Sequence, residues 1–162
     1  LFGGALSDTL NFLTVEEKSD KVVQLHFKVA SGSIDEKAEA EMVSLVNSER
    51  GKQGLSPLFL DEALRGVARA HSNDMFANGY FSHQSLDGHS PFDRMEDAGI
   101  KFEYAGENLA LAPTTPLAMQ GLMNSPGHRA NILSTNVTHF GIGLQGTNSS
   151  GFYLTQEFAA LV

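Results

Sequence analysis

The stretch Asn124–Leu133, which reads NSPGHRANIL, places a Pro-Gly turn between two segments of helical pattern. Pro126 cannot continue a preceding helix, and it restricts Ser125 to extended backbone geometry. Gly127 tolerates the tight backbone that must follow. His128 is therefore held near the start of the second helical segment, where the turn sets the direction of its side chain.

Helical patterns also precede this stretch, and each begins at a recognisable start signal. Ser33 and Glu36 have the spacing of a capping box, and Asp61 is placed to cap a second helix. Ser90-Pro91 has the preferred order for the first residues of a third helix, and Thr115-Pro116 opens a fourth. Four helices are therefore predicted before the Pro-Gly turn.

Strand patterns lie between and after these helices. Phe102–Glu107 is predicted to be a strand that enters a Gly-Glu-Asn turn, and the spans 139–145 and 152–158 are predicted to pair as a hairpin. Gly141 and Gly143 alternate with apolar residues, which predicts a helix packed very close to that face of the sheet. The order of elements predicts an α+β fold with helices stacked on a small antiparallel sheet.

Composition limits the classes of function that this chain can serve. Its 162 residues are 41% hydrophobic and 19% charged, as expected for one globular domain with a sizeable core. A net charge of −8 argues against nonspecific binding of nucleic acid, which requires clustered Lys and Arg. Cysteine is absent, so disulfides, thiolate metal ligands and a cysteine nucleophile are excluded.

Residues 1–32 differ in pattern from residues 33–162, and we predict an N-terminal linker or appendage followed by one domain. Val22–Val29 alternates as a strand would, so this part either pairs with the domain or a partner or forms a disordered tail. Because the chain begins at Leu1, a signal peptide or a membrane or wall anchor could precede it.

Five short motifs occur in a fixed order along the chain: AHSNDM (70–75), FSH (81–83), AGENLA (105–110), SPGHRANIL (125–133) and GIG (141–143). Together they resemble the CAP superfamily, which contains cysteine-rich secretory proteins, venom antigens and plant pathogenesis-related proteins. The match is closest to the bacterial SCP-like branch and covers residues 34–162. The resemblance implies a three-layer α-β-α sandwich with a three-stranded antiparallel sheet, in a secreted or cell-surface protein.

The resemblance also implies a cleft lined by two histidines and two acidic residues. By motif position, His83 and His128 match the histidines, and Glu107 matches the first acidic residue. The second acidic residue is expected just before the Pro-Gly turn, where this chain has Asn124 and Ser125. We therefore do not expect a role that requires paired carboxylates.

Three interpretations of this cleft remain open from the residue types. His83, Glu107 and His128 could form a three-ligand site for a divalent metal, with zinc as the first candidate. One coordination position of the metal would then stay open. A His–Glu pair could also act as general acid and base without metal. In the third interpretation Glu107 caps backbone donors and the histidines bond to it. Ser125 completes the candidate ligand-binding set together with Asn108, which we expect to hold the Gly-Glu-Asn turn.

The motifs favour a binding module of the cell envelope, with an unknown lipid, glycan or protein as its ligand. The alternative is a metal-assisted hydrolase of peptide or ester bonds that uses the same cleft. A third hypothesis is a scaffold fused to an anchor. Catalysis is the less expected outcome, because the second acidic residue is missing and no catalytic motif is recognisable. A serine hydrolase in particular is not expected, because no serine lies in a Gly-x-Ser-x-Gly elbow. His71 lies on an apolar helix face and is predicted to be a satisfied core histidine.

Overall fold

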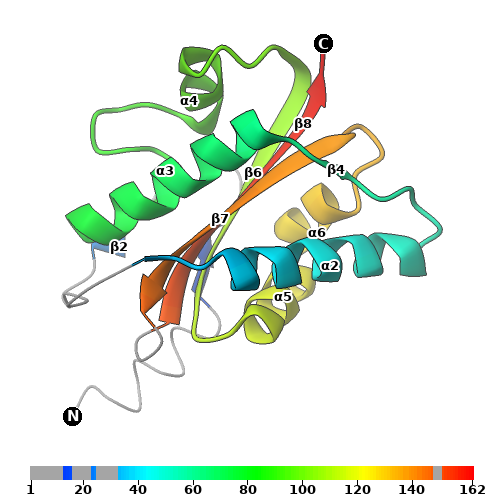
Figure 1. The fold of residues 1–162 in the computed structure, drawn as a ribbon, viewed down its shortest axis with the longest axis horizontal. Coiled ribbons are helices and arrows are strands. Elements are labelled where there is room, and N and C mark those ends of the chain that lie inside the picture. Colours follow the sequence, from blue (N-terminus) through cyan, green and yellow to red (C-terminus); the bar gives the residue numbers. More distant parts are fainter. Residues whose placement is uncertain (1–12, 16–22, 25–32, 148–150) are drawn as a thin grey trace.

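The computed structural model describes residues 13–15, 23–24, 33–147 and 151–162 (Figure 1). Helices and strands are interspersed along the described parts of the chain, and the longest strands lie in its second half. In order they are β1 (Leu13–Val15), β2 (Val23–Gln24), β3 (Ser33–Ile34), α2 (Glu36–Lys52), β4 (Phe59–Leu60), α3 (Glu62–Asn78), β5 (Tyr80–Phe81), α4 (Pro91–Asp97), β6 (Phe102–Ala112), α5 (Thr115–Asn124), α6 (Pro126–Ile132), β7 (His139–Thr147) and β8 (Gly151–Leu161).

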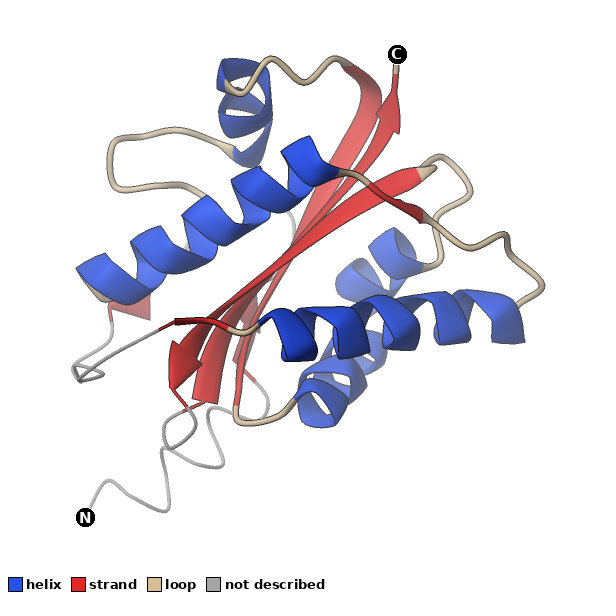
Figure 2. Ribbon diagram, in the orientation of Figure 1, coloured by secondary structure: helices blue, strands red, loops and turns tan. Residues whose placement is uncertain are grey.

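The three long strands β6, β8 and β7 form an antiparallel sheet that lies between two helical layers (Figure 2). Helices α3 and α4 cover one face, and α2, α5 and α6 cover the other. The short strands β1 and β3 extend the sheet in the order β1-β6-β8-β7-β3, and β4 pairs with β7 in parallel. The predicted α-β-α sandwich is confirmed, and so is the hairpin formed by β7 and β8.

Strand alternation assigns the polar residues of the central strands to opposite faces. Glu107 pairs in register with Glu157, and Asn108 pairs with Gln156. Successive side chains of a strand point to opposite faces, so the two glutamates face α3 and α4 while the two amides face α5 and α6. The predicted Gly-Glu-Asn turn is wrong, because β6 continues through these residues as one strand.

Helix α3 packs against β7 at the two alternating glycines. A Cβ atom at Gly141 would lie 2.2 Å from the backbone nitrogen of Arg65, and one at Gly143 would lie 2.3 Å from that of Arg69. The hydroxyl of Ser72 on α3 donates to the carbonyl of Gly143 at 2.9 Å. The close approach predicted from these glycines is confirmed.

Three of the four predicted helix starts are confirmed by the structure. Asp61 caps α3, Ser90 and Asp93 form a capping box on α4, and α5 begins at Thr115 after Thr114 as its cap. The predicted capping box of Ser33 and Glu36 is wrong, because Asp35 is the N-cap of α2 and Ser33 belongs to β3.

Replacing Asp61 by alanine is expected to destabilise the fold by about 1 kcal/mol, because its Oδ1 accepts a hydrogen bond from the Leu64 N–H at 2.9 Å. In a chain of this size, the midpoint of thermal unfolding should fall by about 2–4 °C. Asp61→Ser keeps a capping oxygen and should stay close to the parent. Equal midpoints for the alanine and serine variants would contradict a capping role.

Two short strands of the N-terminal region pair with the domain. β1 pairs with β6, from Leu13 opposite Leu111 to Val15 opposite Leu109, and β2 pairs with β5. Of the strand predicted over Val22–Val29, only Val23–Gln24 is described, and the rest of that prediction lies outside the described residues. The division between an appendage and a domain at residues 32 and 33 stays a prediction. None of the described helices has the length and hydropathy needed to cross a membrane.

Candidate functional site

Glu107 lies near the middle of β6 and is almost fully buried. Its Oε1 contacts Nδ1 of His83 at 2.7 Å, and its Oε2 accepts a hydrogen bond from Nη2 of Arg94 at 2.7 Å. His83 comes from the loop after β5, and Arg94 comes from α4. Both carboxylate oxygens of Glu107 are thus engaged by nitrogen atoms from two other segments.

Arg94 also fixes the loop that carries His83. Its Nη1 donates to the carbonyl of His83 at 2.8 Å, to the hydroxyl of Ser85 at 2.9 Å and to the carbonyl of His89 at 3.2 Å. One guanidinium group therefore joins the strand β6, the helix α4 and the loop between β5 and α4. This arrangement makes the loop geometry depend on the charge of Glu107.

Glu157 of β8 places a second carboxyl group beside Glu107, and it is fully buried. Neither of its oxygens receives a hydrogen bond from a described donor. A carboxylate without donors is unstable in a buried site, so Glu157 keeps its proton, and it can donate that proton to Glu107. We name His83, Arg94, Glu107 and Glu157 the Glu107 cluster.

The two carboxyl groups of this cluster differ in their pKa values. Burial, and then the negative charge of Glu107, raise the pKa of Glu157 well above its ordinary value. Burial acts in the same direction on Glu107. However, the electrostatic interaction with His71, hydrogen bonds with Glu157 and His83, and the charge of Arg94 together outweigh it and hold the pKa of Glu107 well below its ordinary value. The cluster therefore contains one carboxylate, one neutral acid and one guanidinium cation.

The other face of β6 carries a second polar group, formed by Asn108, His128, Asn131 and Gln156, which we name the Asn108 cluster. The side-chain amide of Asn108 donates to the carbonyl of His128 and to Oε1 of Gln156, both at 3.1 Å. Asn131 donates to Oδ1 of Asn108 at 2.9 Å. These bonds attach α6 to the central strands, which is a different role from the turn-holding role expected for Asn108.

His128 lies in the first turn of α6, as the Pro-Gly turn predicts. Its side chain is fully buried. Its Nδ1 contacts the hydroxyl of Ser125 at 2.7 Å. The far end of α6 is held by Arg50, whose Nη1 donates to the carbonyls of Ile132 at 3.0 Å and Ser134 at 2.7 Å. The position of His128 is thus set by packing at both ends of this short helix.

The structure brings His83 and Glu107 into direct contact. The described contacts of His128 include Ser125 and, through its backbone, Asn108. Both of these predicted ligand-binding residues therefore lie beside His128. Convergence of the side chains of His83, Glu107 and His128 on one cleft stays a prediction.

The described residues contain no group of three or more His, Cys, Asp or Glu side chains arranged to hold a metal ion. In this arrangement Glu107 turns both oxygens toward His83 and Arg94, so a divalent cation would have to replace the guanidinium group. Zinc binding by His83, Glu107 and His128 stays a prediction.

Two residues at this site, Glu157 and Arg94, were not identified from the sequence. A glutamate in the run LTQEFAA (154–160) is an unusual residue for a buried strand, and this was a usable signal for Glu157. Nothing in the sequence indicated a role for Arg94, because basic residues are common in short amphipathic helices. His71 is buried as expected, but it is only half satisfied. Its Nε2 bonds to the Ser82 carbonyl at 2.8 Å, while its Nδ1 has no described partner.

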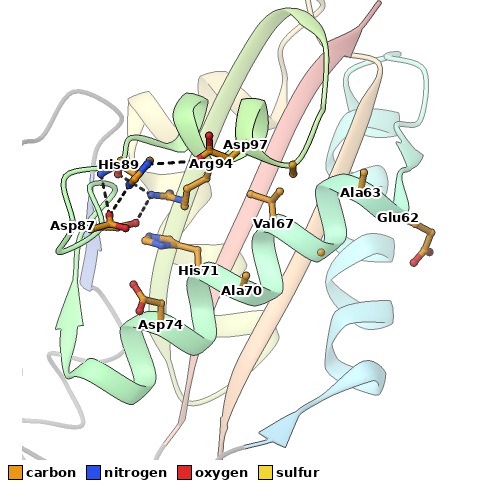
Figure 3. Close-up of a pocket in the computed structure, with 13 residues that line it drawn as sticks. Glu62, Ala63, Val67, Ala70, His71, Asp74, Asp87, His89, Arg94 and Asp97 are labelled. Carbon is orange, nitrogen blue, oxygen red and sulfur yellow. Dashed lines mark hydrogen bonds and ion pairs between the residues drawn. The ribbon is translucent and has the colours of Figure 1, made fainter.

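A pocket of about 590 Å³ lies between α3, α4 and the loop before α4 (Figure 3). His71 and Arg94 line it, so its wall adjoins the Glu107 cluster. In Figure 3 the ring of His71 points from α3 toward Arg94 and Asp87. The residues that line the pocket are Glu62, Ala63, Gly66, Val67, Ala70, His71, Asp74, Ser85, Asp87, His89, Arg94, Asp97 and Ala98.

Comparison with known proteins agrees with this architecture. The model of the cysteine-rich secretory protein family (CAP) matches residues 43–158. The protein YkwD of Bacillus subtilis is 49% identical over 121 residues, which are 74% of this chain and 46% of YkwD. The chain therefore spans less than half the length of this relative.

Similar solved structures include an extracellular protein and an outer surface protein. An extracellular protein from Bacillus anthracis that contains an SCP domain has a TM-score of 0.69 and 34% identity, over 76% of this chain and 40% of that one. An outer surface protein of Borrelia burgdorferi has a TM-score of 0.75 and 21% identity, over 82% of this chain and 100% of that one. The second likeness concerns the fold alone. The chain belongs to the cysteine-rich secretory protein (CAP) family, although it contains no cysteine.

Proposed function

We propose that this chain is an extracellular binding domain that holds a ligand or partner in the pocket between α3 and α4 without chemical turnover. The observation that carries the proposal is that both carboxylate oxygens of Glu107 are already engaged by other side chains. A general base must reach the proton that it removes, but both oxygens of Glu107 are bonded to His83 and Arg94. The cluster instead braces the loop and the helix that form the pocket wall.

Two further features support binding rather than hydrolysis. Glu107 and Glu157 are almost completely buried, and neither lines the described pocket. The pocket volume lies within the range of about 300–1,000 Å³ that is usual for small-molecule sites. The extracellular location is proposed from the Bacillus anthracis relative, which is described as an extracellular protein.

The test is a panel of lipids, cell-wall fragments and peptides, with binding followed by backbone amide resonances of the chain. We expect at least one class to shift resonances of α3, α4 and the loop 82–90. Ala70→Leu should weaken this binding about tenfold or more, because Ala70 is an exposed residue that lines the pocket and leucine would fill space there. Glu41→Gln, on the exposed surface of α2, is the matched control and should bind as the parent does.

The same samples decide between binding and the alternative hydrolase. Ester and peptide substrates are incubated with the protein, with and without added zinc, and we expect no turnover above that of a Glu107→Gln sample. Turnover that requires zinc and Glu107 would overturn the proposal. Binding that Ala70→Leu leaves unchanged would also overturn it, because the ligand would then occupy another surface.

A further inference from the structure

The floor of the pocket is a smooth apolar strip along α3. Ala63, Gly66, Val67 and Ala70 line it, and their spacing of three and four residues places them on one face of the helix. Gly66 has no side chain and the side chains of Ala63, Val67 and Ala70 are short, so the strip leaves room for a narrow aliphatic chain along the helix. It leads to His71 and Asp74.

The walls of the pocket carry more negative than positive charge. Glu62 is paired with Arg65 at 3.2 Å, and Arg94 is already neutralised by Glu107. Asp74 is different, because the described donors to its carboxylate, Tyr80 and Asn78, are both neutral. The negative charge of Asp74 is therefore not compensated by a neighbouring cation.

Residues at the mouth of the pocket add to this excess of negative charge. His89 lies between Asp87 and Asp97, with ring nitrogens 2.9 and 3.3 Å from their oxygens. One imidazole can cancel at most one of these two carboxylates. Together with Asp74, this leaves two uncompensated negative charges around the pocket when His89 is protonated, and three when it is neutral.

His71 supplies an independent indication of what the pocket accepts. Its side chain is 1% exposed, and its Nε2 must carry a hydrogen, because the Ser82 carbonyl can only accept. Burial lowers the pKa of His71, so the ring is neutral and Nδ1 is an acceptor. This atom has no described hydrogen-bond partner. A ligand with an N–H donor would satisfy it.

We propose that this pocket binds an alkylammonium group, with the aliphatic stem on the Ala63–Ala70 strip and the charged nitrogen between Asp74 and Nδ1 of His71. The inference rests on the proposed function and names its ligand class. Two sources present this chemistry, a free aliphatic amine and the side chain of a lysine in a polypeptide.

The experiment titrates the folded chain with n-pentylamine, N-acetyl-lysine methylamide, 1-pentanol and pentanoate, and follows backbone amides and the ¹⁵N resonances of His71. We expect both amines to bind with dissociation constants on the order of 1 mM, as for other very small ligands. Pentanol and pentanoate should bind at least tenfold more weakly. Raising the salt concentration should weaken the amines because the attraction is electrostatic. The Nδ1 resonance of His71 should move with the amines only.

Variants locate the site and separate the two sources. Asp74→Asn keeps an acceptor for Tyr80 and removes the charge, so amine affinity should fall about tenfold, while Glu41→Gln should have no effect. If the lysine derivative binds more tightly than pentylamine, the ligand is a lysine side chain of a polypeptide. If the two bind equally, the ligand is a free aliphatic amine. Equal binding of pentylamine and pentanol would overturn the inference. If the amines showed no preference but a different ligand bound and Ala70→Leu abolished that binding, the alkylammonium assignment would fail while the proposed binding function would stand.

Discussion

Gly143→Ala is expected to lower the free energy of unfolding by about 3 kcal/mol or more, and Gly141→Ala should do the same. The added methyl group at Gly143 would lie 2.3 Å from the backbone nitrogen of Arg69 and 2.5 Å from the carbonyl carbon of Ala68. These are backbone atoms of α3, so no side-chain rotation can remove the overlap. The helix has to move away from the sheet, and the hydrogen bond from Ser72 to the Gly143 carbonyl has to lengthen or break.

The matched control is a glycine-to-alanine substitution on α3, the helix that packs against Gly141 and Gly143. A Cβ at Gly66 meets no atom within 4 Å, and Gly66 lies inside α3. Gly66→Ala should therefore stabilise the fold by about 0.5–1 kcal/mol, because alanine loses less conformational freedom in a helix than glycine does. Urea unfolding followed by circular dichroism measures both changes. A Gly143→Ala variant within about 1 kcal/mol of the parent would show that α3 does not pack on β7 as described.

The packing of α3 on β7 is the kind of feature that a sequence can reveal. Glycines that alternate with apolar residues in a strand leave one face without side chains, and only a closely packed neighbour makes that arrangement stable. Helix ends were equally readable where one local bond decides them, as for Asp61 and Ser90. Ser33 shows the limit, because pairing of β3 with β7 overrides its capping-box spacing.

The candidate site was only partly predictable, because its contacts depend on strand register. Gly106 and Asn108 are turn-forming residue types, yet β6 continues through them because both residues pair in register with β8. That register brings Glu157, which is distant along the chain, to the side of Glu107. The position of Arg94 depends on how α4 docks. Local sequence patterns contain neither the strand register nor the docking of α4. The motifs therefore identified Glu107 and His83 but not Glu157 and Arg94.

The charge state of the Glu107 cluster leads to the second large effect. Glu107→Gln should destabilise the fold by roughly 3 kcal/mol, because it leaves the mostly buried guanidinium of Arg94 without its counter-charge. Glu157→Gln replaces a neutral acid by a neutral amide of similar shape, so its effect should be small at about pH 5. The two substitutions are chemically identical and lie at paired positions, so each is the control for the other.

The double variant tests whether the two glutamates share one proton. When Glu107 becomes neutral, the charge that helps to keep Glu157 protonated is removed. Glu157 can then ionise and replace Glu107 as the partner of Arg94. The Glu107→Gln variant should therefore be partly rescued by Glu157, and the double variant should lose more stability than the two single losses added together. Additive losses would mean that the two carboxyl groups do not interact.

The dependence on pH follows from the raised pKa of Glu157. The folded state retains a proton that the unfolded chain releases above its ordinary pKa of 4.5, so the stability that Glu157 contributes is complete below pH 4.5 and is lost as the pH rises. Glutamine does not titrate. Relative to the parent, Glu157→Gln should therefore gain about tenfold in its folding equilibrium constant for each pH unit, from about pH 5 up to the folded pKa.

The pH dependence that His71 contributes does not affect the comparison between the parent and Glu157→Gln. Burial lowers its pKa, so its own contribution to stability is lost as the pH falls, which is the opposite sign from that of Glu157. Because His71 is present in both proteins, its contribution cancels in the difference between them. Urea unfolding of the parent and of Glu157→Gln at several values between about pH 5 and pH 8 gives that difference directly. Parallel curves would mean that Glu157 is ionised in the folded state, and the Glu107 cluster would then have to hold two negative charges against one guanidinium.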